Sequence, residues 1–225
     1  PAVVPGLPLK PEYTQESLHL VEEGLCNLIK HIENGNKFGV PVVVSINIHK
    51  NDTKAEHELI KKAALKAGAF ACVTSNHWAE GGKGALEVAN ALIEACKKES
   101  KFKFLYELDS TIEEKINKIA KEMYGAGTVD FNAKVREAIR LYTEKGYGKL
   151  PICMAKTSNS LTGDPNIKGA PTNFRLVVND IFLSAGAGFI VPMIGEISRM
   201  PGLPTRPAIY DIDLDTTTGE IIGLS

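Results

Sequence analysis

The sequence of 225 residues lacks several features that would place it in a specialised class of protein. Its longest apolar runs, Gly39 to Ile46 and Ala185 to Ile194, fall well short of the roughly 20 residues that span a bilayer. Neither charge is in excess, because 26 basic residues face 27 acidic ones and the formal net charge is -1. Such a balance gives no general attraction to nucleic acid or to an anionic membrane, so neither is expected as a partner.

Cysteine is scarce, and its spacing includes no C-x-x-C pair. The four cysteines lie far apart on apolar faces, at Cys26, Cys72, Cys96 and Cys153. This pattern is typical of buried, reduced thiols in an intracellular compartment, so no disulfide is expected. The five histidines show no compact ligand spacing with Cys, Asp or Glu, and no metal site is predicted.

The amino end has no initiator Met, signal peptide or Arg-rich presequence. We interpret the chain as a fragment or a processed product. Its composition, 44% hydrophobic and 24% charged, is ordinary for a soluble globular protein and is sufficient for one large core or two small ones.

Common nucleotide-binding motifs are also missing. The turn Gly81 to Gly84 resembles a phosphate-binding loop, but Lys83 is followed by glycine rather than Ser or Thr, and Trp78 stands where the first glycine should be. No G-x-G-x-x-G follows a strand, and nothing marks a nucleophile elbow. An independent nucleotide hydrolase is therefore disfavoured, and the residues alone indicate a binding crevice rather than a reaction.

Apolar periodicity predicts an α/β domain over residues 1–100. A parallel sheet is expected because each β-branched run is followed by a helical pattern. Thr14 is the expected N-cap of the first helix, and Asp52-Thr53 are expected to cap the second. The predicted elements are a helix that follows Thr14 and ends near Gly35, a strand over Val40 to Asn47, a helix over Lys54 to about Lys66, a strand over Ala69 to Ser75 and a helix over Gly84 to Lys97.

Residues 101–225 predict a smaller α+β domain with several strands. Its two helices should end at Gly125 and Gly146, since glycine is favoured just after a helix. Phe102 to Leu105 is predicted as a short strand or an extended piece. The other elements are helices over Thr111 to Tyr124 and Asn132 to Lys145, and strands over Leu150 to Met154, Arg175 to Leu183, Gly188 to Ile194, Ala208 to Asp213 and Ile221 to Leu224. The predicted class is α/β, with a parallel-sheet β-α-β-α half followed by this α+β half.

The only tryptophan, Trp78, marks the first candidate binding site. It lies in the glycine-rich segment from Asn76 to Gly84, directly after the second predicted strand. Open α/β sheets bind ligands beyond the carboxyl ends of their strands, where backbone donors and a flat stacking surface are available. The competing interpretation is a partly buried packing residue, which is the commoner role of a lone tryptophan.

Asn47 ends the first predicted strand and His49 follows it closely. Neighbouring parallel strands end at one edge of the sheet, so His49 and Trp78 are predicted to clamp a common planar ligand. The alternatives are an exposed loop residue for His49 and a simple N-cap for Asp52. The N-cap role is favoured for Asp52.

Lys156 and Thr157 follow the predicted strand at Leu150 and offer a cation and a hydroxyl suited to a carboxylate or phosphate. Two tight turns, Gly186 to Phe189 and Met200 to Pro204, are assigned structural roles, because their glycines supply a positive φ or a close backbone approach.

Several motifs together resemble the formate–tetrahydrofolate ligase family, also called formyltetrahydrofolate synthetases. The similarity runs in order from about Val4 to Ser225. The segments Thr205 to Pro207 and Ile209 to Asp215 resemble the ligase portion of eukaryotic C1-tetrahydrofolate synthases. The motifs are Lys30 to Asn34, Lys37 to Val44, Asn51 to Glu56, His77 to Ala85, Leu150 to Thr157 and Met200 to Pro204.

The resemblance implies a ligase in which ATP phosphorylates formate and N10 of tetrahydrofolate attacks the formyl phosphate, with Mg²⁺ on the nucleotide and a monovalent cation as activator. It implies that an amino-terminal P-loop domain of the same protein holds the nucleotide and formate, and that the protein forms a homo-oligomer. An intracellular location is expected, the cytoplasm ahead of the mitochondrion. This chain would hold no catalytic residue and would be inactive alone.

The family stacks its folate ring between the tryptophan of a W-A-E-G-G motif, matched by Trp78, and an aromatic residue whose position is taken here by His49. The resemblance therefore predicts a folate site, with weaker or differently tuned stacking on the histidine. The predicted folate-binding residues are Asn47, His49, Trp78, Gly81, Gly82 and Lys83. The alternative is a natively separate folate-binding or oligomerisation module without catalysis.

Overall fold

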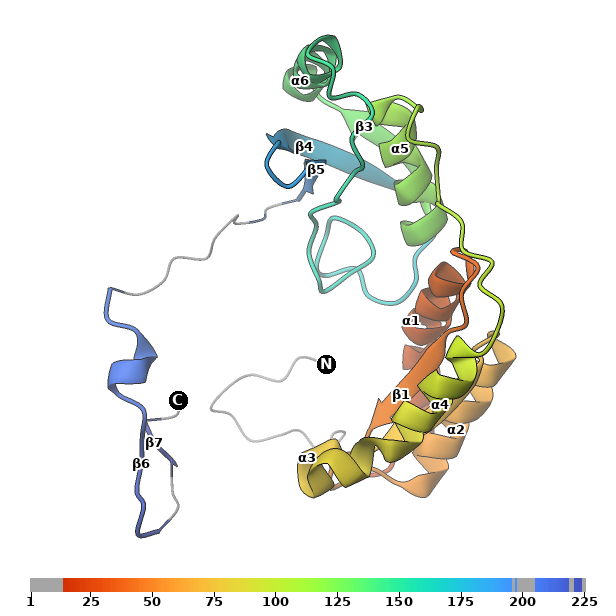
Figure 1. Cartoon of the computed structure of the whole chain (residues 1–225), viewed down its shortest axis with the longest axis vertical. Helices are drawn as coiled ribbons and strands as arrows, with labels where there is room; N and C mark the ends of the chain where they lie inside the picture. The colour runs from red at the N-terminus through yellow and green to blue at the C-terminus, as the bar shows by residue number, and fades with distance from the viewer. Residues whose placement is uncertain (1–13, 196, 198–204, 219–220, 224–225) are drawn as a thin grey trace. The chain divides into compact units, whose positions relative to one another are not determined.

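The computed structural model describes residues 14–195, 197, 205–218 and 221–223 (Figure 1). The chain forms two compact units. The larger comprises Pro11–Ile197, and the smaller combines Pro1–Lys10 with Ser198–Ser225.

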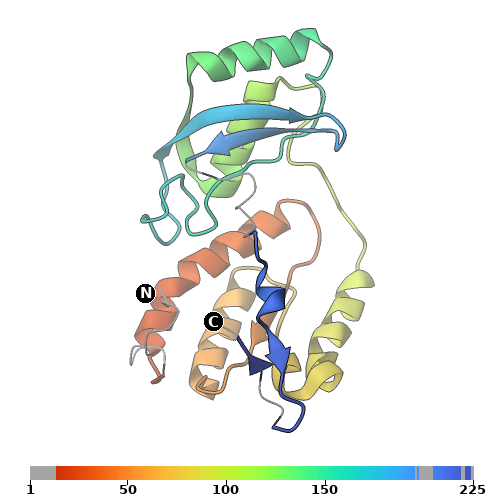
Figure 2. The same cartoon turned by 90° about the vertical axis from the view of Figure 1, so that its left-hand side faces the viewer.

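The first part of the larger unit is a layered α/β arrangement. Strands β1 and β2 pair in parallel from Val43 opposite Ala71 to Asn47 opposite Ser75, which confirms the predicted parallel sheet. Figure 2 shows the sheet between α4 on one side and α1 with α2 on the other. The elements are α1 (Leu18–Asn36), β1 (Val43–Asn47), α2 (Lys54–Lys66), β2 (Ala71–Ser75), α3 (His77–Glu80), the 3-10 turn η2 (Gly81–Ala85) and α4 (Leu86–Cys96).

Local capping explains where these helices begin. Thr53 accepts a hydrogen bond from the backbone N–H of Glu56, whose carboxylate accepts one from the backbone N–H of Thr53. This capping box fixes the start of α2 at the predicted residue. The predicted N-cap of α1 is wrong, because Ser17 rather than Thr14 occupies that position, without a side-chain cap bond.

The second part of the larger unit is a three-stranded sheet in the order β3-β4-β5, with β3 parallel and β5 antiparallel to β4. This mixed sheet and the parallel sheet together confirm the predicted mixed α/β class. The strand β3 was not predicted, and the expected strand from Leu150 is reduced to isolated bridges at Ile152 and Ala155. The elements are α5 (Ile112–Ile119), the π-helical segment η3 (Ala120–Tyr124), β3 (Ala126–Phe131), α6 (Ala133–Glu144), β4 (Phe174–Ser184) and β5 (Phe189–Ile194).

The larger core lies between this sheet and α5 with α6. Alternate residues of β4 explain the layering, because Leu176 and Val178 are buried whereas Val177 between them is exposed. Ile116 of α5 and Val135 of α6 are also fully buried in this cluster. A separate, smaller core around Ile32, Ala64, Ala69 and Cys72 joins α1 and α2 to the parallel sheet.

Polar contacts connect α1 to the end of η3. The Nζ of Lys37 donates to the backbone oxygen of Glu122 at 2.5 Å and to its carboxylate at 2.8 Å. The amide of Asn34 donates to the backbone oxygen of Met123 at 2.8 Å. Cations near the carboxyl end of a helical segment complement its unpaired carbonyls, so these contacts hold the two parts of the larger unit together.

The described part of the smaller unit contains a 3-10 turn, η4 (Ala208–Tyr210), and a short antiparallel pair, β6 (Asp213–Leu214) with β7 (Ile221–Ile222). The prediction of a strand over Ala208 to Asp213 is therefore wrong, since its first residues form the turn. The predicted turn from Met200 to Pro204 lies outside the described residues.

Two further sequence predictions need correction. The expectation that the four thiols are buried is wrong for Cys96 and Cys153, which are exposed; Cys72 is buried, and all four are unpaired. Within the turn before β5, Gly188 has a φ of 76° as predicted, whereas Gly186 does not need its glycine for a positive φ. No helix among the described residues is long and apolar enough to cross a membrane.

Candidate ligand site at the strand ends

The candidate site lies where β1 and β2 end together. Asn47 stands opposite Ser75 in the parallel register, and the backbone N–H of Ile48 donates to the carbonyl of Ser75 at 3.0 Å. The segment after β1 and the segment after β2 therefore leave the same edge of the sheet. This is the arrangement on which the predicted clamp of His49 and Trp78 depends.

Trp78 lies in the short helix α3 and is 86% exposed. A partly buried packing role, the alternative raised by the sequence, does not fit this exposure. An indole that protrudes into solvent leaves its ring faces available to a planar partner. Trp78 is thus positioned as a surface group beside the sheet edge rather than as part of a core.

The segment that carries Trp78 is closed on itself by polar contacts. The backbone N–H of Asn76 donates to the carbonyl of Gly84 at 2.9 Å, and its side-chain amide donates to the Glu80 carboxylate at 2.7 Å. Ser75, buried at the end of β2, lies 2.9 Å through its hydroxyl from Nδ1 of His77. Gly81 ends α3 with a φ of 59° and ψ of -140°, a conformation suited to glycine. The backbone therefore makes a defined turn under the indole.

The facing segment forms a turn of its own. Both Asn47 and His49 are exposed. The backbone N–H of His49 donates to the Asp52 carboxylate at 2.8 Å, and that carboxylate lies 3.4 Å from Nε2 of His57. The N-cap of α2 is Thr53, so the prediction that Asp52 caps the helix is wrong. Asp52 instead holds the turn that carries His49.

The remaining folate-site residues lie on the same glycine-rich segment. Gly81, Gly82 and Lys83 are all exposed in the turn between α3 and α4. The structure therefore brings the two predicted groups, Asn47 with His49 and Trp78 with its following turn, to neighbouring strand ends. Their roles toward a ligand stay predictions.

Lys156 and Thr157 lie elsewhere in the larger unit. The Nζ of Lys156 donates to the carbonyl of Thr157 at 2.8 Å and to the carbonyl of Ser160, and it lies 5.1 Å from the ring centre of Tyr124. Burial lowers the pKa of the Lys156 ammonium below its ordinary value. In this conformation the Lys156 ammonium is hydrogen-bonded to carbonyls of its own loop, and an anion would have to compete with those carbonyls.

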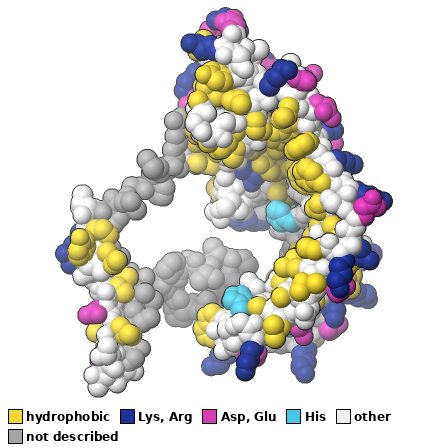
Figure 3. Space-filling view, in the orientation of Figure 1, with side chains coloured by type: hydrophobic (Ala, Val, Ile, Leu, Met, Phe, Trp, Pro, Cys, Tyr) yellow, Lys and Arg dark blue, Asp and Glu magenta, His cyan; other side chains and the backbone are white. Residues whose placement is uncertain are grey.

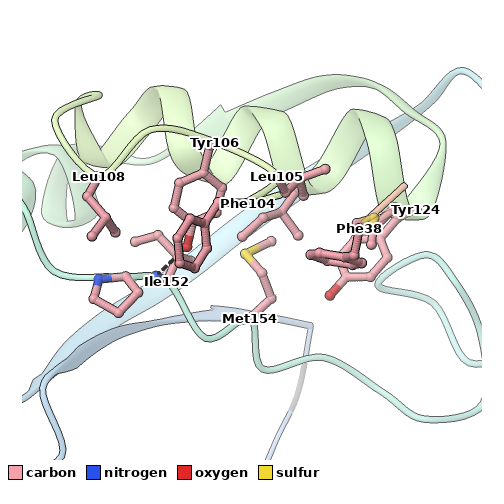
Figure 4. Close-up of a pocket in the computed structure, with 11 residues that line it drawn as sticks. Phe38, Phe104, Leu105, Tyr106, Leu108, Tyr124, Ile152 and Met154 are labelled. Carbon is pink, nitrogen blue, oxygen red and sulfur yellow. Dashed lines mark hydrogen bonds between the residues drawn. The ribbon is translucent and has the colours of Figure 1, made fainter. Parts of the chain in front are cut away.

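The structure also contains an apolar pocket that the sequence did not reveal. Its volume is about 480 Å³, and four of the eleven residues that line it are aromatic: Phe38, Phe104, Tyr106 and Tyr124 (Figure 4). The hydroxyl of Tyr106 accepts a hydrogen bond from the backbone N–H of Ile152 at 2.9 Å. Burial raises the pKa of Tyr124, which also lines the pocket, to about 12. The alternating aromatic residues Phe102, Phe104 and Tyr106 were the sequence pattern that could have indicated this pocket.

These features define a mixed α/β protein with an exposed aromatic side chain at the ends of parallel strands, a placement typical of ligand-binding α/β proteins. Residues 4–225 match the sequence profile of the family described as formate–tetrahydrofolate ligase. The chain therefore belongs to the formate–tetrahydrofolate ligase family, and the resemblance seen in its motifs is confirmed.

Curated relatives agree with this assignment. The chain is 65% identical over 224 residues to the cytoplasmic C-1-tetrahydrofolate synthase of Spodoptera frugiperda, covering 100% of this chain and 24% of the relative. It is 59% identical over 222 residues to the cytoplasmic C-1-tetrahydrofolate synthase of Drosophila melanogaster, covering 99% and 23%. It is 50% identical over 224 residues to the monofunctional mitochondrial C1-tetrahydrofolate synthase of Mus musculus, covering 100% and 23%. The chain spans about a quarter of the length of these relatives.

Proposed function

We propose that this chain is the carboxyl-terminal part of an ATP-dependent ligase that joins formate to tetrahydrofolate, through formyl phosphate, to give 10-formyltetrahydrofolate. Its family membership and the folate-synthase names of its relatives support this activity. Within the ligase, the chain supplies the folate-side wall of the active site and no catalytic residue. Its exposed tryptophan at the strand ends is the observation that carries this role.

The pterin ring stacks on Trp78. A flat heterocycle covers an indole face that otherwise remains in water, and such aromatic contacts contribute about 0.5–1.5 kcal/mol beyond the area that they bury. Gly81, Gly82 and Lys83 lie in the turn that follows Trp78 and give the ring edge and its substituents access to backbone groups and a cation. Support for this arrangement comes from the exposure of all four residues at one end of the sheet.

His49 forms the opposite wall of the folate site, with Asn47 beside it at the end of β1. An imidazole presents a smaller face than a phenyl ring. We therefore expect His49→Phe to bind tetrahydrofolate more tightly than the parent. An unchanged affinity would remove residue 49 from the folate site. Lys156 and Thr157 remain a proposed anion site, which would require Lys156 to leave its loop carbonyls.

The amino-terminal P-loop domain of the same protein covers the apolar side of this chain. Leu86 and Ile93 lie on one face of α4, seven residues apart, and are 58% and 55% exposed. Figure 3 shows hydrophobic side chains over α4 and over the segment that leads to α5. Parallel strands normally lie inside larger sheets that are covered on both faces. The two-stranded sheet and the open α4 face support a missing partner domain, and they favour the ligase over a natively separate module.

ATP with Mg²⁺ and formate bind mainly to that domain, and a monovalent cation activates the complete enzyme. The complete protein is a homo-oligomer that serves one-carbon metabolism and purine biosynthesis. The names of the relatives, some cytoplasmic and some mitochondrial, support an intracellular location. We propose the cytoplasm. Of the three relatives described above, the two that are more than 50% identical to this chain are named as cytoplasmic.

Calorimetric titration of the chain with tetrahydrofolate tests the folate wall. Trp78→Ala should weaken binding about tenfold, since about 1.4 kcal/mol corresponds to a factor of ten. Phe104→Ala is the matched control, because it removes another exposed aromatic side chain, 72% exposed, outside the site. Equal affinity of Trp78→Ala and the parent would refute the proposed role.

A further inference from the structure

The two ends of the segment that carries Trp78 touch through their backbones. The hydrogen bond from the N–H of Asn76 to the carbonyl of Gly84 closes the segment at 2.9 Å. A Cβ atom added to Gly84 would lie 2.3 Å from the backbone oxygen of Asn76 and 2.8 Å from the backbone nitrogen of His77. Such distances are far inside van der Waals contact, and neither obstacle is a flexible side chain. Only glycine allows this closure.

Packing cannot fix the position of Trp78, because 86% of the residue is exposed. The indole is held through its backbone instead, by a helix of four residues and the 3-10 turn that follows. Inside that closed segment, the Asn76 amide donates to the Glu80 carboxylate at 2.7 Å and ties the first turn together. The position of the indole relative to the strand ends therefore depends on the contact between Asn76 and Gly84 that closes the segment.

We propose that Gly84, together with the Asn76–Glu80 pair, positions Trp78 before any ligand binds. Gly84 does so through the close backbone approach, and Glu80 does so by accepting the Asn76 hydrogen bond. The effect on folate affinity rests on the proposed function. The effect on the indole itself does not, and can be measured without a ligand.

The sequence offers a matched glycine pair for the test. Gly82 lies two residues before Gly84, has no atom within 4 Å of an added Cβ and has no positive φ. An alanine there adds a methyl group to the same turn without touching the closure. Gly186, in the turn before β5, is equally open and serves as the control for ligand affinity outside the site.

Because Trp78 is the only tryptophan, the fluorescence anisotropy of the ligand-free chain reports on this segment alone. Gly84→Ala should lower the anisotropy and weaken tetrahydrofolate binding by on the order of tenfold to a hundredfold, as expected for a misplaced contact group. Gly82→Ala should keep the parental anisotropy, and Gly186→Ala should keep both anisotropy and affinity. Parental anisotropy in a folded Gly84→Ala variant would overturn the proposal.

A second pair of variants covers the case in which Gly84→Ala does not fold. Glu80→Ala removes the acceptor and should lower the anisotropy, whereas Glu80→Gln keeps an acceptor oxygen and should restore it. Equal anisotropy of these two variants would contradict the role of the Asn76–Glu80 pair. If the parent chain fails to bind tetrahydrofolate, the folate proposal fails, but the ligand-free anisotropies still decide whether Gly84 positions Trp78.

Discussion

Replacing Lys115 by methionine should destabilise the larger unit, because this fully buried lysine donates hydrogen bonds to two backbone carbonyls. Its exposed fraction is 0%, and its Nζ donates to the carbonyl of Gly148 at 2.8 Å and to that of Leu150 at 3.2 Å. Both acceptors lie on the segment that leads from α6 toward Ile152. Without the ammonium, they lose their charge-assisted donors inside the protein.

The magnitude follows from the side chains exchanged. Hydrogen bonds to a charged group contribute about 1.5–3 kcal/mol each, but relief of the desolvated ammonium offsets part of this loss, so we expect a net cost of about 2–3 kcal/mol for Lys115→Met. Lys115→Ala also removes three buried methylenes, which adds about 2 kcal/mol at about 0.8 kcal/mol per methylene.

Urea unfolding followed by far-ultraviolet circular dichroism measures both variants. Lys118→Met is the control on the same helix, since its side chain is 50% exposed and its ion pair with Glu122 is long, at 3.7 Å; we expect a change within about 0.5 kcal/mol. Lys115→Met with parental stability, or no difference between Lys115→Met and Lys115→Ala, would refute the reasoning.

The same substitution makes a prediction about pH. Burial lowers the pKa of Lys115 in the folded chain, against a smaller opposing effect of Asp109. The unfolded chain then binds this proton more readily, so the contribution of Lys115 to the free energy of unfolding rises as pH increases toward the unfolded pKa of about 10.4. The parent should therefore gain stability relative to Lys115→Met as the pH rises toward about 10. If the difference in the free energy of unfolding between the parent and Lys115→Met became smaller as the pH rises, burial would not be the cause of the lowered pKa.

Two other substitutions test the contacts and the core of the larger unit. Lys37 lowers the pKa of Glu122 by hydrogen bonding and charge, so this pair stabilises the fold above the unfolded pKa of Glu and loses its effect as pH falls. The two side chains are 32% and 39% exposed, so the ion pair is partly screened by water. In urea unfolding, Lys37→Met should lower the free energy of unfolding by about 0.5–1 kcal/mol at pH 7 and by clearly less at pH 3. An equal loss at both pH values would count against the ion pair. Ile116→Ala should cost about 3–5 kcal/mol and Ile116→Val about 0.5–1.5 kcal/mol in the same assay, because the side chain is fully buried; similar small losses would indicate a loosely packed core.

The elements that the sequence predicted well are those with strong local signals. The helix α2 begins and ends at the predicted residues because a capping box at Thr53 and a glycine after its end, Gly68, bound an apolar period. The end of the helix predicted over Thr111 to Tyr124 was marked by Gly125, which adopts the left-handed conformation. Local chemistry decides such boundaries without tertiary contacts.

The missed elements depend on contacts distant in sequence. The strand β3 follows Gly125 directly and contains another glycine, and it is a strand only because Thr128 to Phe131 pair with Arg175 to Val178 of β4. The strand predicted from Ala208 to Asp213 was wrong for the same reason. Its first residues have no long partner strand among the described residues and form a 3-10 turn. Pairing, rather than intrinsic propensity, decided both cases.

For the candidate site, the sequence predicted the meeting of two strand ends, because parallel strands within a β-α-β unit must finish at one edge. It did not predict the closure of the Trp78 segment. That closure depends on a backbone approach between Asn76 and Gly84, which no pattern of residue types announces. The inward turn of Lys156 was hidden for the same reason, since its acceptors are main-chain oxygens.

Quenching of the single tryptophan by tetrahydrofolate tests the folate wall most directly. The emission of Trp78 should fall in a saturable manner, with the same dissociation constant that calorimetry gives, and free N-acetyltryptophanamide in the same solution should correct for light absorbed by the ligand. Emission that stays constant while calorimetry shows saturation would place the bound pterin away from Trp78 and contradict the account.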